Sequence, residues 1–264
     1  MEIIGYLVSI IAGVLLGLLG GGGSVLTVPL LIYLFGFNVL EATLYSLFII
    51  GVSSLGAAIS YLKQRLVNFR VFLLFGGPSL LAVFLVRSFL LPEIPDSICM
   101  GALCFSKRVG ILSLFSGLML MAAYSMIRDN RTRLEQAEHK AGDQFAVLVI
   151  QGLLTGTLTA LVGAGGGFLI VPALVLMAHL EVKKAIGTSL MIIALQSLVG
   201  FAFDGTEVEV QWEFLALLTG ITLFGMQIGV SLSKKIDAKL LKPLFGWFVL
   251  ILALLILVKE IFFV

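Results

Sequence analysis

Hydroxyl side chains and clusters of glycine recur inside apolar stretches of this sequence. Gly20, Gly21, Gly22 and Gly23 stand together in the run GLLGGGGSVLTVPLL, and Ser24 follows them directly. Adjacent glycines unwind a helix and leave backbone N–H groups without intrahelical partners. A helix that restarts after such a turn presents N–H groups and about half a positive charge, which suits an anion. The chemistry indicated is therefore anion binding by neutral groups.

The same pattern returns in the second half of the chain, in the run GTLTALVGAGGGFLIVPALVL. Its turn contains Gly163, Gly165, Gly166 and Gly167. Two broken helices in corresponding positions are the best sequence indication of a transport site. The alternative is that the glycines only let helices pack closely, and the sequence alone leaves it open.

Further polar residues lie inside the apolar stretches. Gln196 is in the middle of MIIALQSLVG, and Ser53 occupies the corresponding place in the first half. Single Ser and Thr residues in membrane helices often form hydrogen bonds only with the backbone of their own helix. Burying the amide side chain of Gln196 costs more free energy than burying such a hydroxyl. No Asp, Glu, Lys or Arg lies in the middle of an expected span, so a buried proton relay is not supported. The expected substrate-binding set is Gly20, Gly21, Gly22, Gly23, Ser24, Thr43, Ser46, Gly163, Gly165, Gly166, Gly167, Thr188, Ser189 and Gln196.

The composition predicts an integral membrane protein. Of the 264 residues, 60% are hydrophobic and 12% charged, against about 45–50% and about 25% in soluble domains. The expected partner is therefore a lipid bilayer, and nucleic acid is not expected. Residues 1–19 lack the basic start of a signal peptide and are expected to remain in the mature protein. Cys99 and Cys104 have no nearby histidine, which argues against a zinc site and leaves a disulfide in an exported loop or two unpaired thiols.

The apolar run 3–35 is too long for one membrane span, because 33 helical residues would measure about 50 Å. We expect the glycines and Pro29 to break it into a long segment and a short one, which either cross the membrane as a broken helix or form a re-entrant hairpin. The same interpretation applies to the second half. The expected segments are 3–19, 24–35, 42–62, 69–86, 109–127, 144–162, 168–180, 185–203, 212–232 and 240–258, with the polar run 128–143 as a linker.

A single offset along the chain places Gly20 on Gly163 and Ser46 on Ser189, which indicates an internal repeat. We call this displacement the repeat offset. The loop 63–70 is basic, whereas its counterpart 204–213 contains four acidic residues and no Lys or Arg. Equivalent loops of opposite charge belong on opposite sides of the membrane.

The expected fold is an all-α polytopic membrane protein of two inverted repeats, 1–127 and 144–264, each with about five segments. The linker is expected in the cytoplasm and both termini outside it.

These motifs, with KKAIGTSL at 183–190, resemble the TauE/SafE sulfite and sulfonate exporter family, also described as toluene-sulfonate uptake permeases. The resemblance covers essentially the whole chain. It implies transport of a small sulfur-containing anion across the bacterial inner membrane. The first half departs from the pattern, because Leu44 and Tyr45 stand where the second half has Gly187 and Thr188. Thr188, Ser189 and Ser46 carry over, whereas Tyr45 does not carry over as an equivalent ligand.

The leading hypothesis is a secondary transporter, an exporter, that works by alternating access at a midplane site. An accessory membrane protein that hands a sulfur compound to a partner is the alternative. An intramembrane hydrolase is not supported, because His179 and His139 lie at a loop edge and in the linker. No catalytic residue, metal or cofactor is expected. The sequence leaves the coupling ion open and is compatible with a homo-oligomer.

Overall fold

The computed structural model describes most of the chain. Described are residues 2–21, 23–90, 97–100, 103–106, 144–162, 167–176, 178–204 and 210–237, with scattered positions in 117–127 and 240–254. The linker 128–143 lies outside this part, as do most residues of the expected segments 109–127 and 240–258.

The first half begins with a helical hairpin. Helix α1 (Glu2–Leu19) ends at the glycine turn, and α2 (Ser24–Tyr33) leads back towards α3 (Val39–Lys63). Gly20 and Gly21 have φ angles of +64° and +126°, which side chains other than glycine rarely adopt. The chain therefore reverses at the glycines. Asn38 caps α3 in a reciprocal capping box with Glu41.

Pro29 does not break the helix, contrary to expectation. It lies inside α2, which continues to Tyr33, and Pro172 likewise lies inside α10 (Gly167–Leu176). Proline is tolerated within membrane helices because neighbouring groups satisfy the freed backbone positions. The reversal thus depends on the glycines alone.

Residues 69–90 form one irregular helical stretch, longer than the expected 69–86. It consists of α4 (Phe69–Val71), the π-helical turn η1 (Phe72–Gly76), α5 (Gly77–Leu85) and a second π-helical turn, η2 (Val86–Leu90). The stretch between the expected segments 69–86 and 109–127 contains an antiparallel β-hairpin of β1 (Ser97–Met100) and β2 (Leu103–Ser106). The backbone positions of Cys99 and Cys104 are directly opposite each other. Apart from this hairpin, the described elements are helical.

The second half contains α9 (Gln144–Val162), α10, α11 (Val182–Asp204) and α12 (Trp212–Lys235). By length and composition, three described helices can cross a membrane: Glu41–Lys63, Val182–Phe203 and Trp212–Lys235. The chain is a multi-pass membrane protein. Helices α1, α9 and the stretch 69–85 are apolar but somewhat shorter.

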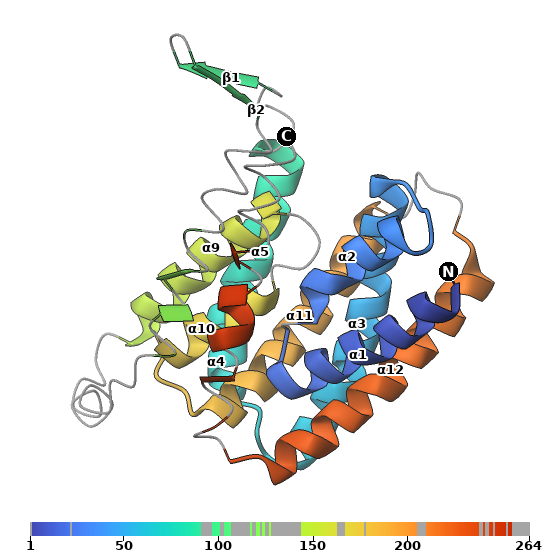
Figure 1. Cartoon of the computed structure of the whole chain (residues 1–264). Coiled ribbons are helices and arrows are strands. Elements are labelled where there is room, and N and C mark those ends of the chain that lie inside the picture. The colour runs from blue at the N-terminus through green and yellow to red at the C-terminus, as the bar shows by residue number, and fades with distance from the viewer. Residues whose placement is uncertain are drawn as a thin grey trace.

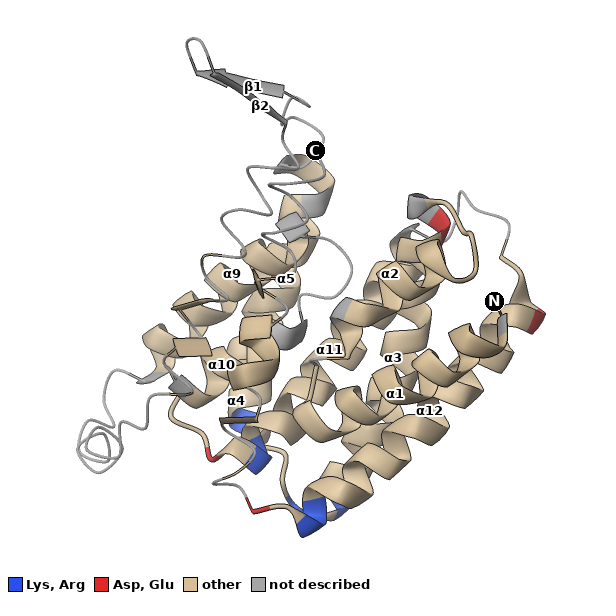
Figure 2. Ribbon diagram, in the orientation of Figure 1, with Lys and Arg blue, Asp and Glu red and all other residues tan. Residues whose placement is uncertain are grey.

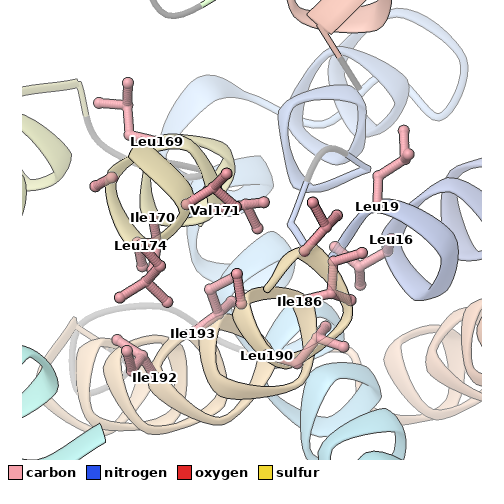
Figure 3. Packing of buried hydrophobic residues seen from close by; sticks show 14 of the residues in the cluster. Leu16, Leu19, Leu169, Ile170, Val171, Leu174, Ile186, Leu190, Ile192 and Ile193 are labelled. Atoms are coloured by element: carbon pink, nitrogen blue, oxygen red, sulfur yellow. The ribbon is translucent and has the colours of Figure 1, made fainter. Parts of the chain in front are cut away.

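Helices from the two halves pack against each other (Figure 1). Helix α1 lies along α12, α3 lies along α11 and α12, and α5 lies along α9. The close-up shows α11 between α10 and the end of α1, with Ile186 and Leu190 near Leu16 and Leu19 (Figure 3). The larger buried cluster thus contains residues from both halves of the chain.

Small residues allow the backbones of these pairs to approach closely. A Cβ atom at Gly13 of α1 would collide with the Thr222 carbonyl of α12. A Cβ atom at Gly156 of α9 would collide with the Ser79 carbonyl of α5. Such contacts are typical of membrane helices, which associate largely through close packing.

Charged side chains lie at the ends of the bundle. Lys and Arg gather at the end where α4 begins and α12 finishes (Figure 2). Helix α12 has Glu213 in its first turn and Lys234 and Lys235 in its last. Helix α3 likewise begins with Glu41 and ends with Lys63. We call the end with Lys63, Lys234 and Lys235 the basic end.

Candidate functional site

The first glycine turn is held by its own backbone. The Gly21 carbonyl accepts hydrogen bonds from the Ser24 backbone N–H at 3.1 Å and from Ser24 Oγ at 2.6 Å. Gly23 lies against the Ala12 carbonyl and Leu16 of α1, with no room for a Cβ atom. Gly22 is outside the described residues. Backbone conformation explains glycine at 20 and 21, and close packing explains it at 23.

Ser189 joins this turn to the other half of the chain. Its Oγ lies 2.9 Å from the Gly20 carbonyl oxygen and 2.8 Å from that of Ile186, so the hydroxyl donates to one or both. Ser189 is fully buried and lies in the second turn of α11, which starts at Val182. The first glycine turn therefore lies near the basic end and not at mid-length of α11.

The second glycine turn was expected to provide the other half of the site. Gly163, Gly165 and Gly166 lie outside the described residues, and Gly167 is the first residue of α10. Helices α2 and α10, which follow the two turns, contact each other. The two short helices are thus neighbours.

Thr188 makes a contact across the two halves at the basic end. Thr188 Oγ1 accepts a hydrogen bond from the backbone N–H of Asn68 at 3.0 Å and donates one to the Lys184 carbonyl at 2.7 Å. Asn68 is the residue that caps α4. Next to it, Gly187 leaves no room for a Cβ atom beside the Leu66 carbonyl. We call the bond from Asn68 to Thr188 the Thr188 contact.

Tyr45 makes a similar contact at the opposite end. Tyr45 Oη accepts a hydrogen bond at 2.8 Å from the backbone N–H of Gln211, the N-cap residue of α12. The ring of Tyr45 is buried and lies 5.0 Å from Phe37 and 6.3 Å from Phe214, measured between ring centroids. We call this bond the Tyr45 contact. Thus Tyr45, excluded as a ligand, has the same kind of partner as Thr188.

The polar residues farther along these helices make different contacts. Gln196 Nε2 donates a hydrogen bond to Ser79 Oγ at 2.7 Å, and both side chains are buried. Ser46 Oγ donates to the Thr43 carbonyl at 2.7 Å. Gln196 therefore bonds α5 and not the glycine turn. Ser79 was not among the residues selected from the sequence. It could have been found because the repeat offset places it on Thr222, so both halves have a hydroxyl residue at this position.

Tyr61 is a second polar residue that sequence reasoning missed. Its hydroxyl lies 3.1 Å from the Gly17 carbonyl oxygen and 2.6 Å from Ser233 Oγ. It joins α1, α3 and α12 near the basic end. An aromatic residue within an apolar run gave no signal of this role.

Three buried polar atoms have no hydrogen-bond partner in the part of the chain that the structure describes. They are Ser53 Oγ, Ser54 Oγ and the Gln151 side-chain oxygen. Apart from the tyrosine hydroxyls, the described buried polar residues are Ser, Thr or Gln, with no buried charge among them. Nor do the described residues include a group of three or more His, Cys, Asp or Glu side chains able to hold a metal. The available chemistry is hydrogen bonding by neutral groups.

A cavity of about 400 Å³ lies at the outer face of α1 and α12, and it does not coincide with these polar residues. Its lining is apolar: Ile10, Ala216, Leu217, Gly220, Ile221 and Phe224. Such a surface suits lipid rather than an anion.

Comparisons with known proteins agree with the helical, apolar structure. Residues 5–256 match the family described as "Sulfite exporter TauE/SafE". A "Probable membrane transporter protein" of Xylella fastidiosa (strain Temecula1 / ATCC 700964) is 30% identical over 253 residues, covering 94% of this chain and 91% of that protein. "Probable membrane transporter protein YunE" of Bacillus subtilis (strain 168) is 26% identical, covering 87% and 88%. No solved structure matches significantly. This agreement over nearly the full length of both chains shows that the chain belongs to the TauE/SafE sulfite exporter family of membrane transporters.

Proposed function

We propose that this chain is a secondary transporter that exports a small sulfur-containing anion, such as sulfite or an organosulfonate. It works by alternating access between two inverted repeats, 1–127 and 144–264, joined by the linker 128–143. Membership of a transporter family supports transport over enzymatic activity. The observation that carries the mechanism is the recurrence of contacts between the halves with the partners exchanged.

The hydrogen bonds at the two ends show this exchange. Asn68 of the first half bonds Thr188 of the second, and Gln211 of the second half bonds Tyr45 of the first. The repeat offset places Asn68 on Gln211 and Tyr45 on Thr188. A pseudo-two-fold axis relating the halves produces such pairs.

Helix packing repeats the same exchange. The close approach of Gly13 to Thr222 corresponds to that of Gly156 to Ser79, again at the repeat offset. The same offset places the first residues of α2, α3 and α4 on the first residues of α10, α11 and α12. This agreement in helix packing supports the proposed repeat in addition to the sequence motifs.

The directions of the central helices support inversion. Gly51 of α3 lies against Leu198 of α11, and Gly187 of α11 lies against Tyr61 of α3. Residues early in one helix thus contact residues late in the other, so α3 and α11 are antiparallel. Equivalent helices of the two repeats therefore run in opposite directions, as inverted topology requires.

The proposed substrate is an anion because the buried polar groups are neutral donors of the kind that bind oxyanions without a buried charge. The proposed substrate-binding groups remain the glycines of the two turns together with Ser24, Thr43, Ser46, Thr188, Ser189 and Gln196. Ser189 contacts Gly20 near the basic end. We therefore place the first glycine turn at the basic-end entrance of the proposed substrate pathway.

The proposed orientation puts the basic end in the cytoplasm of a bacterial cell, following the positive-inside rule (Figure 2). The linker is then cytoplasmic and both termini are outside. In this arrangement the Thr188 contact closes the path on the cytoplasmic side and the Tyr45 contact closes it on the other. Alternating access requires them to open in turn.

Flux of sulfite and sulfoacetate through proteoliposomes containing the purified protein tests this proposal. Wild-type protein should move at least one of these anions, and Ser189→Ala should lower the rate. Phe224→Ala, on an exposed position of α12, is the matched control and should not. A wild-type rate equal to that of empty liposomes for both anions would refute transport of these anions.

The accessory role remains the second candidate, because β1 and β2 place Cys99 opposite Cys104 in register. A protein that passes on a sulfur compound through thiols would lose function when both are replaced by serine. Unchanged flux in the double Cys→Ser variant would instead favour the transporter.

A further inference from the structure

We propose that Ser53 and Ser54, in the middle of α3, form the central binding position for the transported oxyanion. The inference rests on the proposed transport function and names side chains outside the set selected from the sequence. Both side chains are fully buried, and within the described residues neither hydroxyl has a hydrogen-bond partner.

An unpartnered hydroxyl is unusual among the helical serines of this chain. Ser46 and Ser60, on the same helix, donate to backbone carbonyls three or four residues earlier, and Thr222 of α12 does the same. That local bond is the usual way to satisfy a hydroxyl within an apolar helix. A buried polar group without a partner costs free energy, and in a native protein it calls for an explanation, such as a ligand.

The two serines lie where a central site is expected. The contacts of Gly51 with Leu198 and of Gly187 with Tyr61 fix the antiparallel register of α3 and α11. Interpolation between them places Ser53 level with Gln196. Both residues are in the middle third of their helices, between the Thr188 contact and the Tyr45 contact.

Other polar residues lie on the same helix faces as Ser53 and Gln196, nearer the ends of α3 and α11. Ser46 and Ser53 are seven residues apart, as are Ser189 and Gln196, so each pair lies on one face of its helix. Ser189 contacts the glycine turn at Gly20. Gln196 faces α5 through its bond to Ser79, whereas Ser53 shares the face of α3 that carries Gly56 and Ser60 towards α12. At this level of the bundle, Ser53 and Ser54 supply hydroxyl donors that no described residue uses.

The chemistry of these groups favours a small oxyanion. Two hydroxyls can each donate a hydrogen bond to a charged oxygen, and such bonds are stronger than neutral ones. Hydroxyl oxygens also coordinate cations, but hard cations usually take carboxylate ligands as well. The described buried residues include no carboxylate. An anion is therefore the better match.

The test compares the Ser53→Ala/Ser54→Ala double variant with wild type and with Ser60→Ala. Ser60 is the matched control, because it is on α3 but its hydroxyl is bonded to the Gly56 carbonyl. Sulfite flux is measured in proteoliposomes, and thermal unfolding is measured in detergent with and without sulfite. The double variant should lose sulfite flux about tenfold or more, because two bonds to a charged group are removed.

The unfolding measurement separates a ligand site from a structural role. Without sulfite, the double variant should unfold at the same temperature as wild type or higher, because the unpartnered hydroxyls are gone. Stabilisation by sulfite should disappear in it and persist in Ser60→Ala. A lower unfolding temperature with unchanged sulfite stabilisation would identify hydroxyls bound to structural water and would overturn the inference.

The remaining outcomes distinguish this inference from the proposed function. Wild-type flux in the double variant would overturn the central site and leave sulfite transport standing. A change only in the dependence of flux on a sodium gradient would identify a cation site and also overturn it. No sulfite flux or stabilisation in wild type would overturn both for this anion.

Discussion

The two ends of the central helix pair use the same bond in different surroundings. At the Thr188 contact, a short side chain beside Gly187 brings the Leu66–Asn68 backbone directly onto α11. At the Tyr45 contact, Leu44 replaces the glycine, and a long aromatic side chain reaches Gln211 among Phe37 and Phe214. At one end backbone packs against a helix, and at the other end aromatic rings pack around the bond.

In the proposed repeat, the contact is kept while the residues that make it differ. A threonine hydroxyl lies close to the helix axis, so its partner must approach closely, and glycine permits this. A tyrosine hydroxyl lies at the far side of a ring, so its partner stays farther away and other aromatic side chains fill the space. We therefore expect the Tyr45 end to depend on side-chain packing and the Thr188 end on backbone fit.

Removal of the Tyr45 ring should have the largest effect on stability. Tyr45→Ala deletes a buried aromatic side chain, which typically costs about 3–5 kcal/mol. The measurement is equilibrium unfolding in detergent. Phe224→Ala, an exposed aromatic position on α12, is the control and should cost much less. Similar losses at both positions would show that the rings around Tyr45 do not close this end.

Addition of one methyl group should distinguish the Thr188 end. Gly187→Ala places a Cβ atom against the Leu66 carbonyl, and overpacking of this kind costs about 1–3 kcal/mol. Gly220→Ala adds the same atom where, apart from the neighbouring residues and backbone of its own helix, nothing lies within 4 Å. The better helix propensity of alanine should therefore leave stability equal or higher. Equal free energies of unfolding for the two variants would show that the Thr188 end does not depend on close backbone packing.

Removal of single hydroxyls should have the smallest effect, because interhelical hydrogen bonds in membrane proteins average about 0.6 kcal/mol. Tyr45→Phe keeps the ring but removes the acceptor for the Gln211 N–H, and Thr188→Val removes the acceptor for the Asn68 N–H. Hydrogen–deuterium exchange, measured peptide by peptide, is the appropriate readout.

Each of these two variants is the control for the other. Exchange should accelerate at Gln211 in Tyr45→Phe and at Asn68 in Thr188→Val, with the opposite end unchanged. If both amides accelerate in either variant, the two contacts open together, which contradicts alternate opening.

Much of the helical arrangement followed from the sequence. The starts of α2, α9 and α12 were predicted at Ser24, Gln144 and Trp212, because apolar runs with flanking polar or glycine residues mark them clearly. The π-helical turns and the extension to Leu90 were not predicted, because hydropathy does not distinguish helix types. The β-hairpin was missed because Pro92 and Pro95 made the stretch look irregular.

The candidate site was predicted less completely. Ser189 was selected and proved to contact the first glycine turn. Gln196 was selected too, but its partner Ser79 is 117 residues away, and no local pattern links them. The proposal that the two glycine turns converge stays a prediction, because Gly163, Gly165 and Gly166 lie outside the described residues.

The sequence by itself determined the membrane character of the chain, its family and the position of the first reversal at the glycines. These properties depend on composition and local backbone preference, which are readable residue by residue. Only the tertiary structure decided that Gly20 and Gly21 adopt positive φ angles beside Ser189, and that Ser53 and Ser54 are buried without partners among the described residues. Those facts depend on which helices meet, because hydrogen bonds between distant segments are set by three-dimensional packing rather than by neighbours in the chain.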